Sequence, residues 1–502
     1  MDIFLQDLTN SIGLFKPEIA LTITLVVAII ADVICKKSKL TAGYISLVGY
    51  AITFCLLVSG GISTSSMTFT SSLAIDPFSQ FFKIVILISA VVATVMTFNA
   101  KELLEGKNSV GEFYILLIGM TIGMFLLSSA SNLLMIYIAF EIMSISSYVL
   151  AGYTKEVRRA SEASLKYVIY GSLSSGVMIY GISILFGITG TFDLAAINTV
   201  LVNTVSDGIN LPLIVSGVMI FAGIAYKISA VPFHFWTPDV YEGSPVTTTA
   251  LLSVASKAAG FAVLIRFLKA GFIDPATSST DIWHTVSNFD WSYLIAIVAV
   301  LTMTLGNLLA IWQNNVKRML AYSSIAHAGY MLMGVMVMNT AGIEGVMFYF
   351  VAYLLMNFGA FYIVQLIANK TGSEDIKDYE GLAYKNPFIA VAMTVFLVSL
   401  TGMPPFAGFL AKLYLFMPVI EAGYVGIAVI GVLNSVVSVF YYMKVVRNMY
   451  LRGDVLEERE RFSFGKGSLI FLYAMAIPVV FLFINFQPIL EWIKQSAIMI
   501  VR

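Results

Sequence analysis

Long apolar segments, each about as long as a bilayer is thick, recur along the whole chain. A membrane-spanning helix needs about 20 mostly apolar residues, and each such run is predicted to be a helix because a lone strand cannot satisfy its backbone in lipid. The predicted spans cover residues 19–35, 42–60, 77–98, 113–128, 133–152, 165–187, 211–231, 246–268, 291–312, 319–338, 345–368, 388–418, 424–446 and 469–492. We therefore expect an all-α integral membrane protein with about 14 transmembrane helices.

Two lysines of these spans lie beside prolines that would interrupt a helix. Pro232 comes five residues after Lys227, directly after the seventh span, and the pair Pro404-Pro405 precedes Lys412 in the twelfth. Proline removes a backbone donor and interrupts a helix. Breaks at corresponding places of two halves are typical of transport pathways built from inverted repeats. Ordinary proline kinks in a helical bundle are the alternative.

The spacing of the two breaks predicts the organisation of the chain. Spans four to eight and spans nine to thirteen would form two five-helix repeats, and an odd number of spans reverses the topology of the second. The predicted units are residues 1–110 with the first three helices, 111–270 with the first repeat, 271–450 with the second repeat, and 451–502 with a cytoplasmic loop and the last helix.

Composition agrees with the membrane assignment. Of 502 residues, 59% are hydrophobic and 12% charged, and the mean hydropathy is +0.89, whereas soluble domains are roughly 45–50% apolar and about 25% charged. Basic and acidic residues are equal in number at 29 each, so the charge balance does not indicate a nucleic-acid partner. Asp2 and Asp7 precede Lys16, unlike the basic start of a cleaved signal peptide. We expect the first span to be retained.

Basic residues in short loops predict the orientation. One side of the membrane receives Lys36, Lys37, Lys39, Lys101, Lys107, Lys155, Arg158, Arg159, Lys317, Arg318, Lys370, Lys377, Lys385, Arg447, Arg452, Arg459, Arg461 and Lys466. The opposite loops hold mainly acidic residues, among them Asp76, Asp193 and Asp274. The basic side is expected to be the cytoplasm, so both termini should lie on the non-cytoplasmic side.

Several charges fall inside apolar runs, where an ionisable group is a functional-site hypothesis by default because it is costly to insert. They are Glu141, Lys166, Lys227, Lys257 and Lys412. The alternative is a structural ion pair or a span boundary misplaced by a turn, which applies most to Lys166. Lys83, Lys444 and Arg266 lie near span ends, where snorkelling to the headgroups would account for them.

This set of charges favours proton movement over other chemistry. A buried lysine loses its proton more easily than one in water, and a nearby carboxylate reverses that effect, so lysine beside a movable counter-charge is a proton switch. His234 and His327 are possible extensions of the relay, with packing as the alternative. Cys35 and Cys55 are too few for an iron–sulfur cluster, which usually takes four thiolates, and three histidines give little support to a haem.

At these residues the chain resembles a known family. The segment KISAVPFHFWTPDVYEGSPVTTTALLSVASKAAGFAVLIRF, from Lys227 to Phe267, is similar to the core of the antiporter-like membrane subunits of respiratory complex I, most closely the subunit N branch. NNVKRMLAYSSIAHAGYMLMG and LTGMPPFAGFLAKLYLF match the same family. The family commonly has a further proline near Thr247, so the start of span eight is expected to be less kinked here.

The resemblance implies a role for each charge. Glu141 would be the acidic partner, Lys166 a modulating lysine, Lys227 the central lysine, Lys257 the connecting lysine and Lys412 the exit-side lysine. It also implies a bacterial inner-membrane translocase subunit with no redox site or bound cofactor of its own. NADH, flavin, iron–sulfur clusters and a quinone would be used by other subunits, and the partners would be the bilayer and other membrane subunits, including related antiporter-like ones.

Three other interpretations remain open from the sequence. The nearest is a subunit of a multi-subunit sodium/proton antiporter, which resembles the same fold and lysine set. A membrane-embedded redox or quinone-binding enzyme is a different class. A purely structural scaffold is the third, and it predicts that neutralising the mid-span lysines leaves transport intact.

Overall fold

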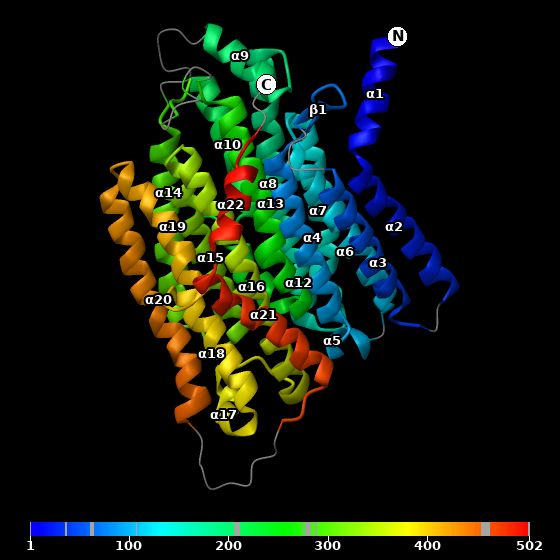
Figure 1. Cartoon of the computed structure of the whole chain (residues 1–502), viewed down its shortest axis with the longest axis vertical. Helices are drawn as coiled ribbons and strands as arrows, with labels where there is room; N and C mark the ends of the chain where they lie inside the picture. Colours follow the sequence, from blue (N-terminus) through cyan, green and yellow to red (C-terminus); the bar gives the residue numbers. More distant parts are fainter. Residues whose placement is uncertain are drawn as a thin grey trace.

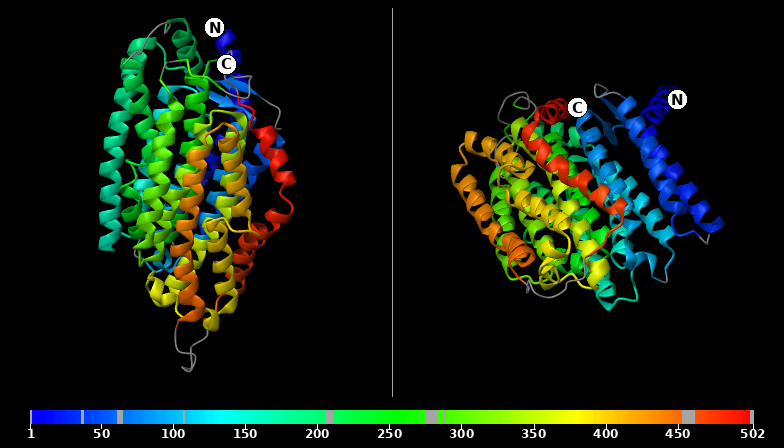
Figure 2. Two further views of the ribbon diagram at one scale, coloured as in Figure 1. Left: turned by 90° about the vertical axis from the view of Figure 1, so that its left-hand side faces the viewer. Right: turned by 60° about the horizontal axis from the view of Figure 1, so that its bottom comes forward.

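The chain folds into an elongated bundle whose helices run mostly along its long axis (Figures 1 and 2). The computed structural model describes residues 2–35, 38–60, 65–106, 108–204, 211–274, 277, 283–286, 289–452 and 462–499. Helices α5 and α17 lie at one end of the bundle, and α1 and α9 at the other (Figure 1). Loops of the predicted basic side therefore gather at the α5/α17 end.

The N-terminal unit precedes the first repeat and contains a small hairpin. Its elements are α1 (Asp2–Leu14), α2 (Lys16–Ile34), α3 (Thr41–Ser59), β1 (Ser66–Thr68), β2 (Leu73–Ile75), α4 (Pro77–Thr97) and α5 (Lys101–Leu104). The two strands pair antiparallel with Met67 opposite Ala74. Asp76 begins α4 through a reciprocal capping box with Ser79, which satisfies two backbone donors at the start of the helix.

The first predicted repeat supplies eight α-helices in the described residues and one π-helical segment. They are α6 (Val110–Ser129), α7 (Leu133–Ala151), α8 (Arg158–Thr189), α9 (Leu194–Thr204), α10 (Leu211–Lys227), α11 (Trp236–Gly243), α12 (Val246–Leu251), the π-helix η1 (Leu252–Ser256) and α13 (Lys257–Gly271). Helix α13 directly continues α12 and η1, so these three elements form one span.

The second predicted repeat follows the same plan. Its elements are α14 (Trp291–Ile311), α15 (Val316–Met336), α16 (Thr340–Thr371), the 3-10 helix η2 (Ile376–Tyr379), α17 (Leu382–Lys385), α18 (Pro387–Thr401), α19 (Ala407–Glu421) and α20 (Val425–Leu451). The chain ends with α21 (Lys466–Ile484) and α22 (Gln487–Ser496), which cross the front of the bundle in Figure 1.

The helical fold is as predicted, with differences in detail. Within the described residues, eleven helices are long and apolar enough to cross a membrane by length and composition. The other three predicted spans correspond to α10 with α11, to α15, and to α18 with α19, so the total of fourteen stays a prediction. The last predicted span is divided into α21 and α22, and α1 and α9 are helices that the apolar pattern did not predict.

The two predicted repeats carry the same backbone motif. Asn132 caps α7 and forms an isolated bridge with Asp193, just as Asn315 caps α15 and forms one with Asp375. The first pair lies next to α9 and the second next to η2 and α17, at opposite ends of the bundle (Figure 1). Equivalent motifs at opposite ends are what inverted repeats require, although the domain boundaries remain a prediction.

Candidate functional site

The first helix break lies between α10 and α11, where residues 228–235 are not helical. The break is held by side chains from elsewhere as well as by Pro232. The Val231 amide donates to Thr302 Oγ1 of α14 at 2.9 Å, and the Trp236 indole donates to the Tyr226 carbonyl at 3.0 Å. Backbone groups freed at membrane depth are therefore partly satisfied by the protein, as irregular structure in a bilayer demands.

Lys227 is the last residue of α10, and its side chain points into the bundle. It is 1% exposed. Its ammonium donates to Ser144 Oγ of α7 at 3.0 Å and to the Tyr167 hydroxyl of α8 at 3.5 Å. It also lies 5.5 Å from the centre of the Tyr167 ring, within the range of a cation–π interaction.

Glu141 lies on α7 one turn before Ser144 and is partly exposed. Ser144, one turn further along α7, accepts the hydrogen bond from the Lys227 ammonium. Among the described residues Glu141 has no basic nitrogen within 4.0 Å, unlike the acids of the ion pairs found elsewhere in the chain. Glu141 is therefore one turn away from the residue that binds Lys227, without forming an ion pair with that lysine.

Lys257 joins the two predicted repeats. It begins α13 immediately after the π-helix η1 and is fully buried. Its ammonium donates to the carbonyl and hydroxyl oxygens of Ser324 on α15, at 2.6 and 3.0 Å. A π-helical turn is rare and often marks a functional site. Span eight begins as a regular α-helix at Val246–Leu251 and η1 follows it, so the expectation of a less kinked start stays a prediction.

The second break lies between α18 and α19, at residues 402–406, where Pro404 and Pro405 fall. Gly402 ends α18 with φ +83°, and a side chain at this position would meet the Lys412 stem, with its Cβ 2.6 Å from Lys412 Cδ. Lys412 is on α19 but reaches back over the break. Its ammonium donates to the carbonyl of Thr401, the last residue of α18, at 2.8 Å and to Ser435 Oγ at 3.0 Å.

His327 on α15 lies between the last two lysines. Its Nδ1 is 2.6 Å from the Tyr349 hydroxyl and its Nε2 is 3.2 Å from the Tyr442 hydroxyl. On α15 it follows Ser324, which binds Lys257, by one turn and precedes Tyr330, whose ring centre lies 4.7 Å from the Lys412 ammonium, by one turn. His234 is in the first break, where its ring packs on Phe235 and its Nδ1 has no hydrogen-bond partner among the described residues.

Lys166 is placed differently from the other four charges. Its ammonium pairs with Asp239 of α11 at 2.6 Å and with Glu162 at 2.8 Å, and its side chain is 38% exposed. Asp239 also binds Arg318 of α15 at 2.7 Å. Lys166 therefore belongs to a surface network that ties α8 to the second half of the broken helix.

Two basic residues attributed to snorkelling are instead in buried ion pairs, so that expectation is wrong for them. Lys83 binds Glu18 of α2 at 2.6 Å, with both side chains at most 3% exposed. Arg266 makes a bidentate pair with Asp76, both bonds being 2.9 Å. Lys444 follows the expectation better, since it is partly exposed and donates to the Gln313 carbonyl at the end of α14.

Six lysines of the bundle fall into two classes by the atoms they bind. Lys83, Lys166 and Lys317 bind carboxylates. Lys227, Lys257 and Lys412 bind only hydroxyl and carbonyl oxygens among the described residues. A serine hydroxyl can accept a hydrogen bond from an ammonium and donate one to a neutral amine, so these three sites can accommodate both protonation states.

The sequence identified the buried charged residues, but it did not identify most of the residues that bind them. Glu18, Asp239 and Tyr442 were not singled out, because each is ordinary in its local sequence and gains its role from a distant contact. A usable signal was present for one of them: Glu18 is an acid directly before the first predicted span, and an acid that becomes buried requires a partner.

Comparison with known proteins gives the chain its family context. The family described as NADH:quinone oxidoreductase/Mrp antiporter, TM, matches residues 130–438. The NADH-quinone oxidoreductase subunit N 2 of Chloroherpeton thalassium is 44% identical over 488 residues, which cover 96% of this chain and 94% of that protein. These matches include both breaks and all five mid-span charges.

Solved structures share the fold. A chain of respiratory complex I from Thermus thermophilus superposes with a TM-score of 0.78 at 27% identity, covering 95% of this chain and 98% of that one. A chain of the Mrp complex from Dietzia sp. gives the same TM-score at 18% identity, with 96% and 97% covered. At that lower identity the likeness is one of fold alone.

Proposed function

Since this chain belongs to the NADH:quinone oxidoreductase/Mrp antiporter membrane family, we propose that it is a proton-translocating membrane subunit of a bacterial NADH:quinone oxidoreductase. The full-length similarity to a subunit N protein supports this assignment over a sodium/proton antiporter, for which the Mrp structure offers a shared fold. Its partners are the other membrane subunits of that complex and the bilayer.

The observation that carries the mechanism is the set of neutral oxygen partners around Lys227, Lys257 and Lys412. A lysine bound to a carboxylate is held as a cation. A lysine bound to serine can release its proton and keep a hydrogen bond, at a cost that the surroundings can adjust. These three lysines are therefore the groups whose charge changes during transport.

The relay runs from Glu141 to Lys412 through groups whose charges interact. Glu141 favours the protonated form of Lys227. Lys257 connects the repeats through Ser324, and His327 lies on α15 between Ser324 and Tyr330, whose ring faces Lys412. A charge change at one lysine alters the cost of a charge on the next, which is how energy from another subunit would pass along the row. Lys166 adjusts the position of α11 through Asp239.

The redox chemistry that drives the relay belongs to other subunits in this proposal. NADH, flavin, iron–sulfur clusters and the quinone are bound there, and this chain contributes no redox site. The two cysteines are exposed and separate, which supports the assignment. The subunit lies in the bacterial inner membrane with the basic α5/α17 end in the cytoplasm, so both termini are on the other side.

The test compares two lysine substitutions in the assembled complex. Lys227→Met should leave NADH oxidation by inverted vesicles largely intact and abolish the part of proton uptake that this subunit supplies. Lys444→Met changes a lysine near a span end that binds a loop carbonyl, and it should leave proton uptake unchanged. Equal proton uptake per NADH in the two variants would refute the proposal, as would purification of the chain without flavin- and iron–sulfur-containing partners.

A further inference from the structure

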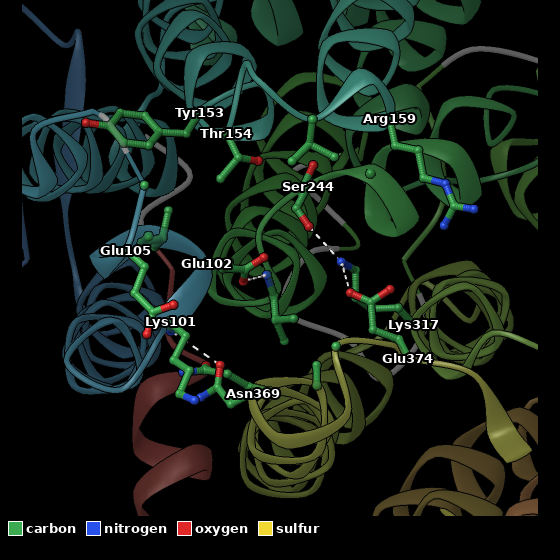
Figure 3. Close-up of a pocket in the computed structure, with 18 of the residues that line it drawn as sticks. Lys101, Glu102, Glu105, Tyr153, Thr154, Arg159, Ser244, Lys317, Asn369 and Glu374 are labelled. Atoms are coloured by element: carbon green, nitrogen blue, oxygen red, sulfur yellow. Dashed lines mark hydrogen bonds and ion pairs between the residues drawn. The ribbon is translucent and has the colours of Figure 1, made fainter. Parts of the chain in front are cut away.

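Two cavities at opposite ends of the bundle differ in the charges of their walls. The cavity at the α5/α17 end has a volume of about 620 Å³ and is lined by five glutamates and three basic residues (Figure 3). Its buried Lys317 donates to Glu374 Oε1 at 2.9 Å and to the Ser244 carbonyl at 2.8 Å. Acidic groups outnumber basic ones in this wall, which disfavours an anionic ligand.

The second cavity lies at the α1/α9 end, in the N-terminal unit. It has a volume of about 280 Å³ and is enclosed by the start of α2, the end of α3 and the start of α4, with the last residues of α1 beside it. Its charged lining residues are Lys16, Asp76 and Lys83. Lys16 is exposed, whereas Lys83 is only 2% exposed. One cation at the surface and one buried cation therefore border the same space.

The acidic groups around this cavity are already bound to other cations. Asp76 has both carboxylate oxygens bound to Arg266, at 2.9 Å each. Glu18 binds Lys83 at 2.6 Å and is not part of the cavity wall. Lys16 has no carboxylate within 4.0 Å among the described residues. The two ion pairs are neutral, so the charge of Lys16 is left uncompensated.

Lys83 also has hydrogen-bond donors left for a ligand. A lysine ammonium carries three N–H donors, and its acceptor among the described residues is Glu18 Oε1. Two other polar side chains of the wall are already engaged, since Gln80 donates to the Leu57 carbonyl and Ser79 forms the capping box of α4. The available donors are thus ammonium groups, which bind phosphate as point charges.

The cavity lies near the depth of lipid headgroups. Lys83 is seven residues after Asp76, or about 10 Å along α4. A helical side chain leans toward the start of its helix, so the Lys83 ammonium lies closer to the end of the bundle than its backbone does. The headgroup layer extends about 5–8 Å beyond the hydrocarbon core on each side. A phosphate at this ammonium would therefore sit close to the boundary between the two layers.

Apolar helix faces adjoin the cavity. Helix α2 begins at it and α3 ends at it, and both helices lie at one edge of the bundle (Figures 1 and 2). Aliphatic side chains along the two helices are exposed, among them Ile23, Val26, Ile30, Val48 and Ile52. A free phosphate would leave these side chains uncovered, whereas acyl chains joined to the phosphate can pack along them.

We infer that this cavity binds the phosphate of an anionic phospholipid from the leaflet at the α1/α9 end. The phosphate lies between the ammonium groups of Lys16 and Lys83, and the acyl chains run along α2 and α3. The lipid supplies the negative charge that Lys16 lacks and an acceptor for the remaining donors of Lys83. This site does not depend on what the chain transports.

The experiment identifies the lipid by covalent capture in the assembled complex. The purified complex is incubated in detergent with phosphatidylglycerol that carries a photoreactive diazirine in its acyl chain, and mass spectrometry maps the labelled peptides after illumination. Labelling of residues 16–24 and 54–60 is expected. Unlabelled phosphatidylglycerol should compete, and inorganic phosphate at the same concentration should not.

Lys16→Gln tests the charge at this site. Labelling of the two segments should fall about fivefold, the factor that one basic residue near an anionic lipid contributes, and Lys16→Glu should lower it further. Both variants should assemble, because Lys16 is exposed and has no ion pair among the described residues. Lys39→Gln is the matched control. Lys39 is also exposed but precedes the opposite end of α3, so its loss should leave this labelling unchanged.

Three results would overturn the inference. Equal labelling by the photoreactive form of phosphatidylcholine, which has no net charge, would show a lipid bound without regard to charge. Loss of labelling on addition of inorganic phosphate would show a site for free phosphate. Labelling confined to other subunits would show that another chain covers this cavity.

Discussion

Helices α8 and α16 are corresponding helices of the two predicted repeats, and they share their construction. Each has 32 residues and ends at a left-handed glycine, Gly190 with φ +72° and Gly372 with φ +73°. Their surroundings differ. In the most apolar segment of each helix, 33% of the residues are buried in α8 and 89% in α16. The repeat determines the length and the end of each helix, but the position of the helix in the bundle determines how much of it is buried.

The polar side chains of the two helices follow that difference. Gln365 and Asn357 of α16 correspond to Ser183 and Ser175 of α8 when the two C-terminal glycines are aligned. The amide of Gln365 donates to the Met96 carbonyl of α4, and that of Asn357 donates to Ser253 of η1. Ser183, by contrast, is exposed. The second predicted repeat therefore has buried polar contacts at these positions that the first does not share at Ser183.

The charged positions differ between the halves in the same way. Counted from the capping asparagines Asn132 and Asn315, the position of Glu141 is taken by Ser324 and that of Ser144 by His327. The first half thus offers a carboxylate near its lysine, and the second offers a hydroxyl and an imidazole. We expect the two halves to hold a proton with different strength.

The largest effect is expected from removal of the second-half lysine. Lys412→Met should abolish the proton uptake that depends on this subunit while the complex still assembles, because its partners Thr401 and Ser435 are neutral and are left with no unpaired charge. Proton uptake and the amount of complex on native gels measure the two outcomes.

Lys83→Met is the contrast for that variant. It leaves Glu18 buried without its cation, and breaking a buried pair costs about 3–5 kcal/mol, so assembly should fall. Loss of assembly in Lys412→Met of the same size would mean that Lys412 is structural and that the two classes of lysine are not distinct.

A smaller and graded effect is expected at the position where the halves differ most. Glu141→Gln should reduce proton uptake severely, because Lys227 loses the nearby negative charge, and Glu141→Asp should retain part of it. Ser324→Ala should have the mildest effect, since the Ser324 carbonyl still accepts from Lys257 at 2.6 Å. The measurement is proton uptake per NADH oxidised, made on vesicles of all three variants. A larger loss in Ser324→Ala than in Glu141→Gln would contradict the expected difference between the two halves.

The smallest effect should come from the shared backbone motif. Asn132→Ala and Asn315→Ala each remove a side chain that caps a helix, at a cost of about 1 kcal/mol. Both should lower the melting temperature of the complex slightly and leave proton uptake per NADH unchanged. A change in coupling, but not in stability, at either site would show that the motif does more than begin a helix.

The sequence predicted the helices and the buried charges because both depend on local pattern. An apolar run of about 20 residues and a lysine within it can be read without tertiary information. The breaks at Pro232 and Pro404-Pro405 were predicted for the same reason. The anchoring of the first break by Thr302 was not, since that contact joins residues far apart in the chain.

The local sequence pattern could not predict which residues form ion pairs with the charged side chains. The sequence treated Lys83, Arg266 and Lys166 by their distance from a span end, but the structure decides their state by the acids that reach them from other helices. The π-helix before Lys257 was missed because no proline or glycine marks it within residues 252–256.

The reach of Lys412 over the second break also bears on how such proteins should be aligned. The lysine of the first half is the last residue of α10, and that of the second half is several residues into α19, yet its ammonium rests on the last residue of α18. A residue-by-residue alignment of the halves places these lysines apart. In both halves, however, the ammonium lies at the helix break. The position of the side-chain nitrogen is therefore a better guide to equivalent lysines in the two repeats than the aligned position of the residue.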